Sequence, residues 1–362
     1  MDQRATSILH DPAGPDLARH IITFDPDEPA SRLFSAVPTE ARAGLTAIPW
    51  PAGLEPQTVT PAKAPSPSHP LPKADVLVVT WTVAEAKALA DVLTPGVPSS
   101  AWHVYRHKFD SYKPNIRAGA PALESDCLGV YYQCQIGQHS VVCMKSDLHL
   151  SQDGPKLPVR ALWRQIIEET GAKLVITTGT AGGIGAETLL GDVIVTKSVQ
   201  FDCKKTFAKS PFAKATYTNG ELDAASAGRF TAADKSLIPA NAGRLPQAPR
   251  TPLIVPATAA DPAMVLTTDF FAFDDTTDSY KLREYNQHAR AVEMGDAVLG
   301  LVCAEDLTNP PKWAIVRNAS DPQIDGSVPL KEQAQQAAHI YEKYGYWTTV
   351  GSAIGCWALI AD

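Results

Sequence analysis

The stretch VITTGTAGGIG, residues 175–185, joins an apolar, β-branched run to a cluster of very small side chains. Residues 175–178 have the composition of a buried strand. Glycines at the end of a strand let backbone N–H groups approach a ligand closely, and Thr180 adds a hydroxyl group. The alternative is that Gly182 and Gly183 form only a tight turn. The stretch is neither a dinucleotide-binding fingerprint at a helix start nor a Walker A loop, because no Gly-Lys-Ser or Gly-Lys-Thr follows.

Segments typical of strands and helices alternate on both sides of this stretch. The hydrophobic patterns predict strands at 74–82, 172–183, 191–202, 263–273 and 312–321, a short strand and a helix within 290–307, and helices at 83–93, 157–171 and 330–345. Residues 129–145 predict a β-hairpin that turns at Ile136-Gly137-Gln138. This order predicts an α/β fold with a mostly parallel or mixed central sheet flanked by helices on both faces.

Residues 1–72 differ from the rest of the chain. The segment PWPAGLEPQTVTPAKAPSPSHPLPK, residues 49–73, is rich in proline, alanine and serine, which is typical of an extended linker or a wrapping arm. The residues before it are compatible with short helices. We therefore predict a Pro-rich N-terminal extension at 1–72 without a core of its own, followed by one α/β domain at 73–362.

The composition excludes several classes of protein. The net charge of −7 over 362 residues shows no basic footprint for nucleic acid or an anionic membrane. No window approaches the roughly 18 apolar residues that span a bilayer, and the N-terminus lacks a signal-peptide pattern, so we expect a cytoplasmic protein. The six cysteines form no CxxC pair and are expected to be free thiols. The histidines lack metal-binding spacing, and we expect neither a metal nor a cofactor.

The predicted strands end in residues that can carry chemistry. In open α/β sheets the ligand crevice lies at the carboxyl ends of the strands. Here those ends read TWTVAE, TAGG, TTDFF, VEMGD and RNASD. Carboxylates, small residues and aromatic rings are therefore expected to converge on one edge of the sheet.

These motifs, taken in order, resemble the nucleoside phosphorylase and nucleosidase superfamily. TTGTAGGIG…LLGDVIVTKSVQFD, TTDFFAF, RAVEMGDAVLGLVC and AIVRNASD are most similar to methylthioadenosine/S-adenosylhomocysteine nucleosidase-like proteins, over roughly residues 74–350. The resemblance implies a nucleoside phosphorylase-like fold and cleavage of the N-glycosidic bond between a base and ribose. The transition state of that reaction resembles an oxocarbenium ion, so the protein has to protonate the leaving base and position the nucleophile.

The resemblance implies two catalytic carboxyl groups. Asp321, preceded by Ser320, corresponds to the general acid at N7 of the purine, a role that requires a pKa raised toward neutrality. Glu85 corresponds to the carboxylate that polarises the attacking water. The structural alternatives are a turn or helix cap at Asp321-Pro322 and an exposed helix residue at Glu85. Phosphorolytic relatives carry a Gly-Asp-Pro-Arg type of loop, which TWTVAEA lacks, so hydrolysis is favoured.

The resemblance also implies a set of substrate-binding residues. Glu293 and Met294 correspond to residues at the ribose, and Phe271 to an aromatic ring on the base, with Phe201 or Phe270 as a second face. Thr180, Ala181 and Gly182 are expected on the ribose or nucleophile side. Where the family has a second Glu that binds the ribose hydroxyls, this chain has Gly295, and Asp296 is a possible substitute. Lys156 stands in the tetrad Asp153-Gly154-Pro155-Lys156, where the family has Gly-Ile-Gly-Lys.

The 5′ group of the substrate stays open at this point. Convergence of basic residues would favour a nucleotide such as AMP or ATP, and a solvated face is the alternative. The basic candidates are Lys145, Lys156, Lys204, Lys205, Arg106, His107, Lys108, Lys113 and Arg117.

The sequence thus predicts a purine nucleoside or nucleotide N-glycosidase that works by acid-assisted hydrolysis. A phosphate-dependent phosphorylase and a non-catalytic nucleoside sensor are the alternatives. The expected partner is a small-molecule nucleoside or nucleotide. We also expect a homodimer or a higher homo-oligomer, with the N-terminal extension across the partner or over the pocket mouth.

Overall fold

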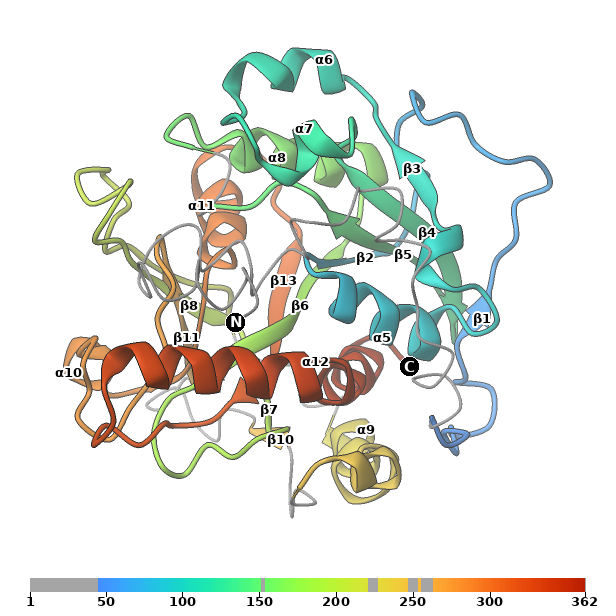
Figure 1. Ribbon diagram of the computed structural model, residues 1–362. Helices are drawn as coiled ribbons and strands as arrows, with labels where there is room; N and C mark the ends of the chain where they lie inside the picture. The colour runs from blue at the N-terminus through green and yellow to red at the C-terminus, as the bar shows by residue number, and fades with distance from the viewer. Residues whose placement is uncertain (1–44, 151–153, 221–226, 247–252, 255–262, 362) are drawn as a thin grey trace.

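The computed structural model describes residues 45–150, 154–220, 227–246, 253–254 and 263–361. In this part of the chain, one mixed β-sheet is flanked by helices on both faces (Figure 1). Helices α5 (Val83–Leu93) and α12 (Leu330–Ile360) cover one face, and α8 (Pro158–Thr170) and α11 (Ala297–Glu305) cover the other. The predicted α/β class and mixed sheet are confirmed.

Strand β6 (Leu174–Gly183) is the centre of the sheet. Its first half pairs in parallel with β2 (Val76–Thr80), its whole length pairs in parallel with β13 (Lys312–Asp321), and its last residues pair antiparallel with β12 (Ala289–Glu293). Gly182 and Gly183 therefore belong to the strand, and the tight-turn alternative is wrong. The carboxyl end of β6 lies between the ends of β13 and β12.

The other strands extend the sheet in both directions. On the β2 side follow β5 (His139–Ser146), β4 (Gly129–Ile136), β3 (His103–Tyr105) and β1 (Gln57–Thr58). On the β12 side follow β11 (Met264–Thr268), β8 (Ser198–Asp202) and β9 (Thr216–Thr218), while β7 (Val193–Thr196) pairs with β13 and with β10 (Leu253–Ile254). The expected hairpin is β4–β5, which is antiparallel.

Short helices lie in the connections. They are α6 (Phe109–Tyr112), α7 (Pro121–Glu124), α9 (Ala227–Ala232) and α10 (Leu282–Tyr285). Helices α6 and α7 belong to the insertion between β3 and β4, which lies at the top of Figure 1.

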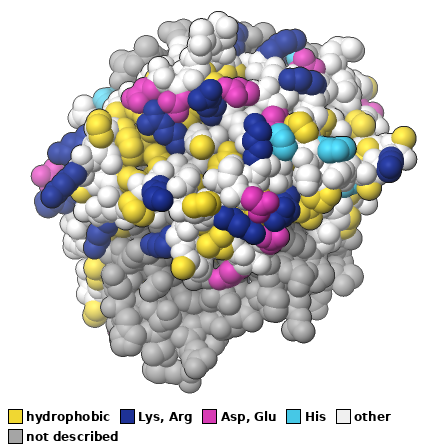
Figure 2. Space-filling model, turned by 90° about the horizontal axis from the view of Figure 1, so that it is seen from above, with side chains coloured by type: hydrophobic (Ala, Val, Ile, Leu, Met, Phe, Trp, Pro, Cys, Tyr) yellow, Lys and Arg dark blue, Asp and Glu magenta, His cyan; other side chains and the backbone are white. Residues whose placement is uncertain are grey.

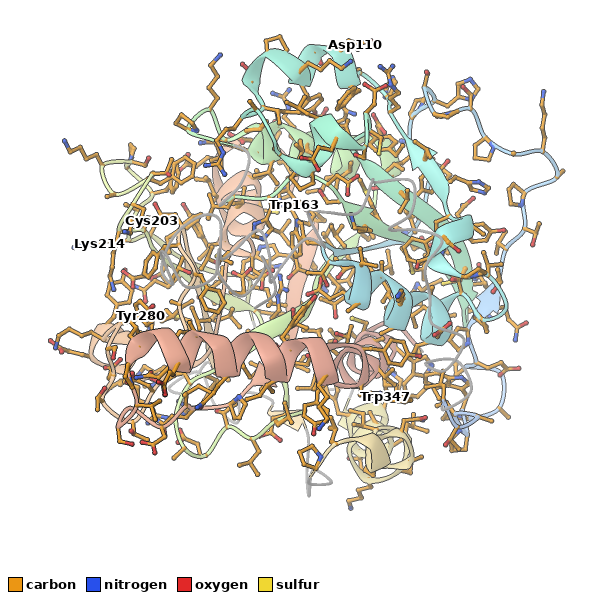
Figure 3. The ribbon with its side chains drawn as sticks, viewed as in Figure 1. Asp110, Trp163, Cys203, Lys214, Tyr280 and Trp347 are labelled. Carbon is orange, nitrogen blue, oxygen red and sulfur yellow. The ribbon has the colours of Figure 1, made fainter. Side chains whose placement is uncertain are left out.

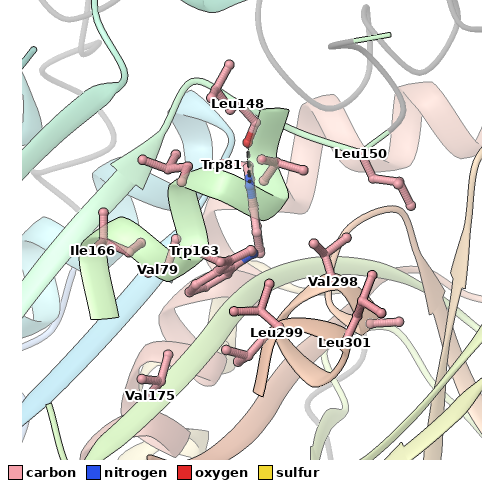
Figure 4. Close-up of a cluster of buried hydrophobic side chains, with 14 of the residues drawn as sticks. Val79, Trp81, Leu148, Leu150, Trp163, Ile166, Val175, Val298, Leu299 and Leu301 are labelled. Carbon is pink, nitrogen blue, oxygen red and sulfur yellow. Dashed lines mark hydrogen bonds between the residues drawn. The ribbon is translucent and has the colours of Figure 1, made fainter. Parts of the chain in front are cut away.

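Alternation along β2 shows how the sheet separates the two main cores. Leu77 and Val79 face α8 and α11, whereas Val76 and Val78 face α5 and α12. Because both faces of the strand are covered, the sequence reads as a continuous apolar run rather than as an alternating one. Figure 4 shows part of the first core, where Trp163 of α8 packs near Val79, Val175 and Leu299.

The described part of the N-terminal extension, residues 45–72, lies on the domain. Strand β1 pairs antiparallel with β4, and Trp50 contacts Trp357 of α12 with ring centroids 4.9 Å apart. Trp357 Nε1 donates a hydrogen bond to the carbonyl of Leu54 (2.6 Å), and the Leu71 N–H donates one to Glu169 of α8 (2.8 Å). The short helices expected earlier in the extension fall outside the described residues.

Two expectations about composition can be compared with this fold. All six cysteines are buried and free, as predicted. In the described ranges, no helix is long and apolar enough to cross a membrane, and no cluster of three metal-ligating side chains occurs.

Candidate active site

A pocket opens at the carboxyl ends of the central strands. The ends of β6, β12 and β13 and the loop after β11 line it. Trp81 and Glu85 after β2, His149 after β5 and Tyr341 of α12 complete the lining. The predicted convergence of strand ends therefore occurs. Nine of the predicted site residues line this pocket: Glu85, Thr180, Ala181, Gly182, Phe271, Glu293, Met294, Ser320 and Asp321.

Asp321 is the last residue of β13 and is buried at the pocket wall. Burial raises the pKa of its carboxyl group to about 6, while a hydrogen bond from the Ser320 hydroxyl (2.9 Å) acts in the opposite direction. Gly182 makes room for this group, because a Cβ at position 182 would lie 3.1 Å from Asp321 Oδ2. Asp321 can therefore be protonated close to neutral pH.

Glu85 lies in the first turn of α5, and it is buried rather than exposed. Its Oε2 accepts hydrogen bonds from the Thr80 hydroxyl (2.7 Å) and from the N–H groups of Trp81 (3.0 Å) and Thr82 (2.8 Å). Its Oε1 accepts from the N–H and the hydroxyl of Thr180, both at 2.7 Å. Five donors thus hold a carboxylate at the pocket wall.

Gly179 explains how Glu85 comes so close to β6. It has a φ of +144°, and a Cβ there would lie 2.5 Å from the carboxyl carbon of Glu85. The absence of a side chain lets the carboxylate reach the backbone of the next residue, Thr180. The small residues of the 175–185 stretch therefore make space for two carboxyl groups, Glu85 at Gly179 and Asp321 at Gly182.

A buried charge cluster forms the floor between β12 and β13. Arg317 binds both carboxylate oxygens of Asp296, at 2.8 Å through Nε and 2.5 Å through Nη2, and Nη2 lies 3.3 Å from Glu293 Oε2. Its Nη1 donates to the carbonyl of Thr180 (3.2 Å), and its guanidinium carbon lies 4.9 Å from the centroid of the Trp81 ring. Four hydrogen bonds thus hold the guanidinium of Arg317 on protein partners.

Glu293 is held by the start of α11. Its carboxylate accepts from the N–H groups of Gly295 (2.5 Å) and Asp296 (2.9 Å) and from the hydroxyl of Thr267. Burial and the neighbouring Asp296 raise its pKa, and Arg317 opposes that shift. Asp296 itself does not line the pocket, because it is fully buried against Arg317. The prediction that Asp296 reaches the ribose is therefore wrong.

Two further aromatic residues line the pocket near Arg317 and Gly295. Trp81 Nε1 donates to the carbonyl of Leu148 (3.1 Å), as Figure 4 shows, and its ring meets His149 edge to face at 5.5 Å. Burial lowers the pKa of His149 to about 3, with a further contribution from the Arg317 charge, so the imidazole is neutral at physiological pH. Gly295 faces this ring.

The sequence interpretation missed six residues that line the pocket: Trp81, His149, Ala272, Val292, Arg317 and Tyr341. Arg317 had a signal, since it is the one charged residue inside the apolar run of β13. Trp81 stood directly before the helix that carries Glu85. His149 and Tyr341 gave none, because the first follows a strand by a few residues and the second lies in the middle of a long helix.

Lys156 lies outside this pocket. Its side chain is exposed and donates to the carbonyl of Pro114 (3.2 Å). It borders a separate surface hollow together with Lys108 and Arg160. Lys156 is therefore not among the residues that line this pocket. Phe201 packs against Phe212 in the core, and Phe270 packs against Tyr280, so neither lines the pocket.

The other basic candidates do not converge on the pocket either. Lys145 is paired with Asp147 in the core, Lys204 with Asp202 (2.7 Å) and Lys113 with Asp126 (2.9 Å). On the face above α6 and α7, basic and acidic side chains are interspersed (Figure 2), and Asp110 of α6 lies at the outer edge of the molecule (Figure 3). The alternative of a solvated face applies to this insertion.

Comparison with known proteins agrees with this arrangement. Residues 82–341 match the sequence model of the phosphorylase superfamily, and the chain belongs to that superfamily. Among solved structures, the chain is similar to a mutant of the Helicobacter pylori MTAN with 5′-methylthioadenosine in its active site, at 12% identity and a TM-score of 0.50, covering 79% of this chain and 98% of that one.

A second similar structure is the 5′-methylthioadenosine/S-adenosylhomocysteine nucleosidase of Helicobacter pylori with butyl-thio-DADMe-Immucillin-A. It has 12% identity and a TM-score of 0.50, and the match covers 80% of this chain and 98% of that one. The curated proteins give no match. At this identity the two structures establish the fold, which is the nucleosidase fold that the motifs predicted.

Proposed function

We propose that the protein is a purine nucleoside N-glycosidase that hydrolyses the bond between the base and the ribose. The observation that carries the proposal is Asp321, a buried carboxyl group at the end of β13 whose pKa is raised to about 6. A protonated Asp321 supplies a proton to a basic ring nitrogen of the leaving purine. The electron pair of the breaking C–N bond then goes to the base, which leaves as a neutral molecule.

Glu85 is proposed to serve the nucleophile. Its negative charge, held by five donors, faces the pocket and polarises a water molecule that attacks the sugar carbon. The same charge favours the positive oxocarbenium-like transition state. Because both oxygens already accept hydrogen bonds, full proton transfer to Glu85 requires one of these donors to withdraw. Glu85 and Asp321 line the same pocket and divide the two roles: Glu85 serves the nucleophile, and the protonated Asp321 serves the leaving base.

The charges in the pocket support water rather than phosphate as the nucleophile. Of the described residues, Arg317 is the only lysine or arginine that lines the pocket, and its charge is balanced by Asp296. A phosphate dianion would meet the carboxylate of Glu85 without a cation that is not already paired. Like charges at this distance repel in a buried site.

The absence of an unpaired cation among the described residues of the pocket also supports an uncharged 5′ group on the substrate. The remaining side of the pocket is formed by Phe271, Met294 and Tyr341, which belong to one hydrophobic cluster. An apolar or neutral substituent fits such a surface better than a 5′-phosphate. We therefore propose a nucleoside rather than a nucleotide as the substrate.

A non-catalytic nucleoside sensor is the competing function. The superfamily pocket can bind without reacting, since function lies in the site and not in the fold. Asp321, a buried acid of raised pKa in the same pocket as the carboxyl group of Glu85, supports catalysis, because recognition alone has no need for an acid of raised pKa.

The proposal is tested by chromatographic detection of free base from a panel of nucleosides and nucleotides. The panel contains adenosine, inosine, guanosine, methylthioadenosine, S-adenosylhomocysteine, AMP and ATP, each with and without phosphate. We expect phosphate-independent release of a purine from at least one nucleoside, and loss of release in Asp321→Asn. Formation of ribose 1-phosphate would establish a phosphorylase instead, and binding without release would establish a sensor.

The oligomeric state is a separate question, and light scattering tests the expected homodimer.

A further inference from the structure

Most polar groups at the pocket are already engaged within the protein. The carboxylates of Glu85 and Glu293 accept hydrogen bonds on both oxygens, and the guanidinium of Arg317 is bound on every nitrogen. The hydroxyls of Thr180 and Ser320 donate to carboxyl groups, and Trp81 Nε1 donates to a carbonyl. A sugar presents several hydroxyl groups, and a further polar side chain at this pocket would give one of them a hydrogen-bond partner.

His149 has the position for that contact. It lines the pocket beside Glu293 and Arg317, on the wall that Trp81 forms. Its imidazole lies over Gly295, where a Cβ would come within 3.1 Å of His149 Nε2. The missing side chain at position 295 thus makes the space in which the Nε2 edge of the ring sits. Tyr341, the other polar ring at the pocket, packs against the hydrophobic cluster that contains Phe271 and Met294.

We propose that His149, seated over Gly295, binds a ribose hydroxyl group and sets the preference of the pocket for a ribonucleoside over its deoxy analogues. This inference rests on the proposed function, because it takes a nucleoside as the ligand.

The chemistry of the ring fits this role. A neutral imidazole carries one donor and one acceptor, so it can keep a protein contact through one nitrogen and meet a hydroxyl through the other. A neutral group also adds no charge to a pocket that already contains Glu85, Glu293 and Asp321. Because the pKa of His149 is lowered to about 3, its contribution to binding stays constant across the pH range in which Asp321 titrates.

The experiment measures binding rather than turnover, so that it does not depend on catalysis. Calorimetric titration of Asp321→Asn with adenosine, 2′-deoxyadenosine and 3′-deoxyadenosine gives the discrimination between the three. We expect adenosine to bind roughly 10- to 100-fold more tightly than at least one deoxy analogue, the effect of one buried hydrogen bond. In the double variant with His149→Phe, which keeps a ring against Trp81, that difference should disappear.

Three further variants make the test sharper. His149→Gln, which restores a donor and an acceptor, should recover part of the discrimination. Gly295→Ala, whose methyl group crowds Nε2, should reduce it. His139→Ala, at the far end of β5, should leave it unchanged.

The outcomes separate this inference from the proposed function. Discrimination that persists in His149→Phe, or equal affinity for all three nucleosides before the change, overturns the role of His149. Tight, discriminating binding with no base release from the wild-type protein overturns only the glycosidase activity. Absence of binding for all three nucleosides overturns both.

Discussion

At the scale of single residues, the site depends on two glycines in β6 that face two carboxyl groups. Gly179 leaves the space for Glu85, and Gly182 leaves the space for Asp321. The two groups differ in environment: five donors surround Glu85, whereas the Ser320 hydroxyl is the one recorded donor to Asp321. Donors favour the charged form of a carboxyl group, and burial without them favours the neutral form.

The raised pKa of Asp321 predicts a pH dependence of the reaction. A general acid works only while it is protonated, so kcat/KM should fall about tenfold per pH unit above pH ~6. Measurement of base release between pH 4.5 and 9 checks this limb. A rate that stays constant through this range would contradict the assignment of the acid.

The same shift predicts an effect on stability. The folded protein holds the Asp321 proton more tightly than the unfolded chain, so this residue lowers the free energy of unfolding as pH rises from ~4 to ~6. At pH 7.5 the free energy of unfolding is lower by on the order of 3 kcal/mol, because the pKa of Asp321 is raised from 3.8 to about 6 in the folded protein. Asp321→Asn should therefore raise Tm at pH 7.5 and lose that advantage at pH 4. Equal Tm differences at both pH values would show that the charge is not the cause.

Gly179 allows a sharper test of packing at the site. Gly179→Ala places a methyl group against the carboxyl carbon of Glu85 and should cost more than about 3 kcal/mol of stability, with loss of base release. Gly96 is the matched control, because it also has a positive φ, +84°, but nothing within 4 Å of its Cβ position. Gly96→Ala should cost only about 1 kcal/mol. Urea unfolding of both variants measures the contrast, and equal costs would contradict the close approach of Glu85.

At the scale of elements, the buried ion pair between Arg317 and Asp296 ties β13 to the start of α11. The two partners are held by two hydrogen bonds, and neither is exposed. This contact fixes the end of β13, and with it Ser320 and Asp321, relative to β12. Asp296 therefore contributes to the site through its position in the framework.

Removal of Asp296, the partner of Arg317, should lower the stability of the protein. Asp296→Ala leaves the guanidinium of Arg317 buried without its main counterion and should cost about 3–5 kcal/mol in the free energy of unfolding. Denaturant unfolding measures this cost. Wild-type stability with a raised KM alone would instead indicate that Asp296 binds substrate directly. Glu305→Ala, an exposed carboxylate on the same helix that lies 3.0 Å from Arg160, is the control and should change stability by less than about 1 kcal/mol.

At the scale of the whole molecule, the segment 45–72 closes the core between the sheet and α12. Trp50 contacts the ring of Trp357, and the carbonyl of Leu54 accepts a hydrogen bond from the indole N–H of Trp357. Leu71 is buried. The proline-rich composition predicted an extended linker or a wrapping arm. The described residues 45–72 pack on the domain. None of its described residues lines the pocket.

Deletion of residues 1–72 should therefore yield a folded but less stable domain. The loss of the cover on Trp357 exposes apolar surface, and we expect a decrease in Tm of several degrees, which corresponds to roughly 2 kcal/mol or more for a chain of this size. Scanning calorimetry measures it, and Trp50→Ala should reproduce part of the decrease. An unchanged Tm would contradict the contact, and an unfolded product would show that the segment is essential to the core.

Much of the fold and part of the site followed from local patterns. The apolar runs, the helical spacing and the hairpin predicted the order of elements, because hydrophobic periodicity depends on neighbours in the chain. The convergence of Glu85 and Asp321 followed from their places at strand ends, since β2, β6 and β13 run in parallel and present the same end to one edge. Glu293 reaches the same pocket on β12, which runs antiparallel to β6.

The sequence by itself determined the α/β class, the superfamily and the motif that carries Asp321. Only the tertiary structure decided which charges face the pocket and which face each other. Asp296 and Lys156 stand beside the motifs in sequence, yet one is bound by Arg317 and the other is on the surface. His149 stands apart from the motifs, yet its ring occupies the space over Gly295. The physical reason is that ion pairing and burial depend on residues that are distant in the chain and close in space, and no local pattern records that distance.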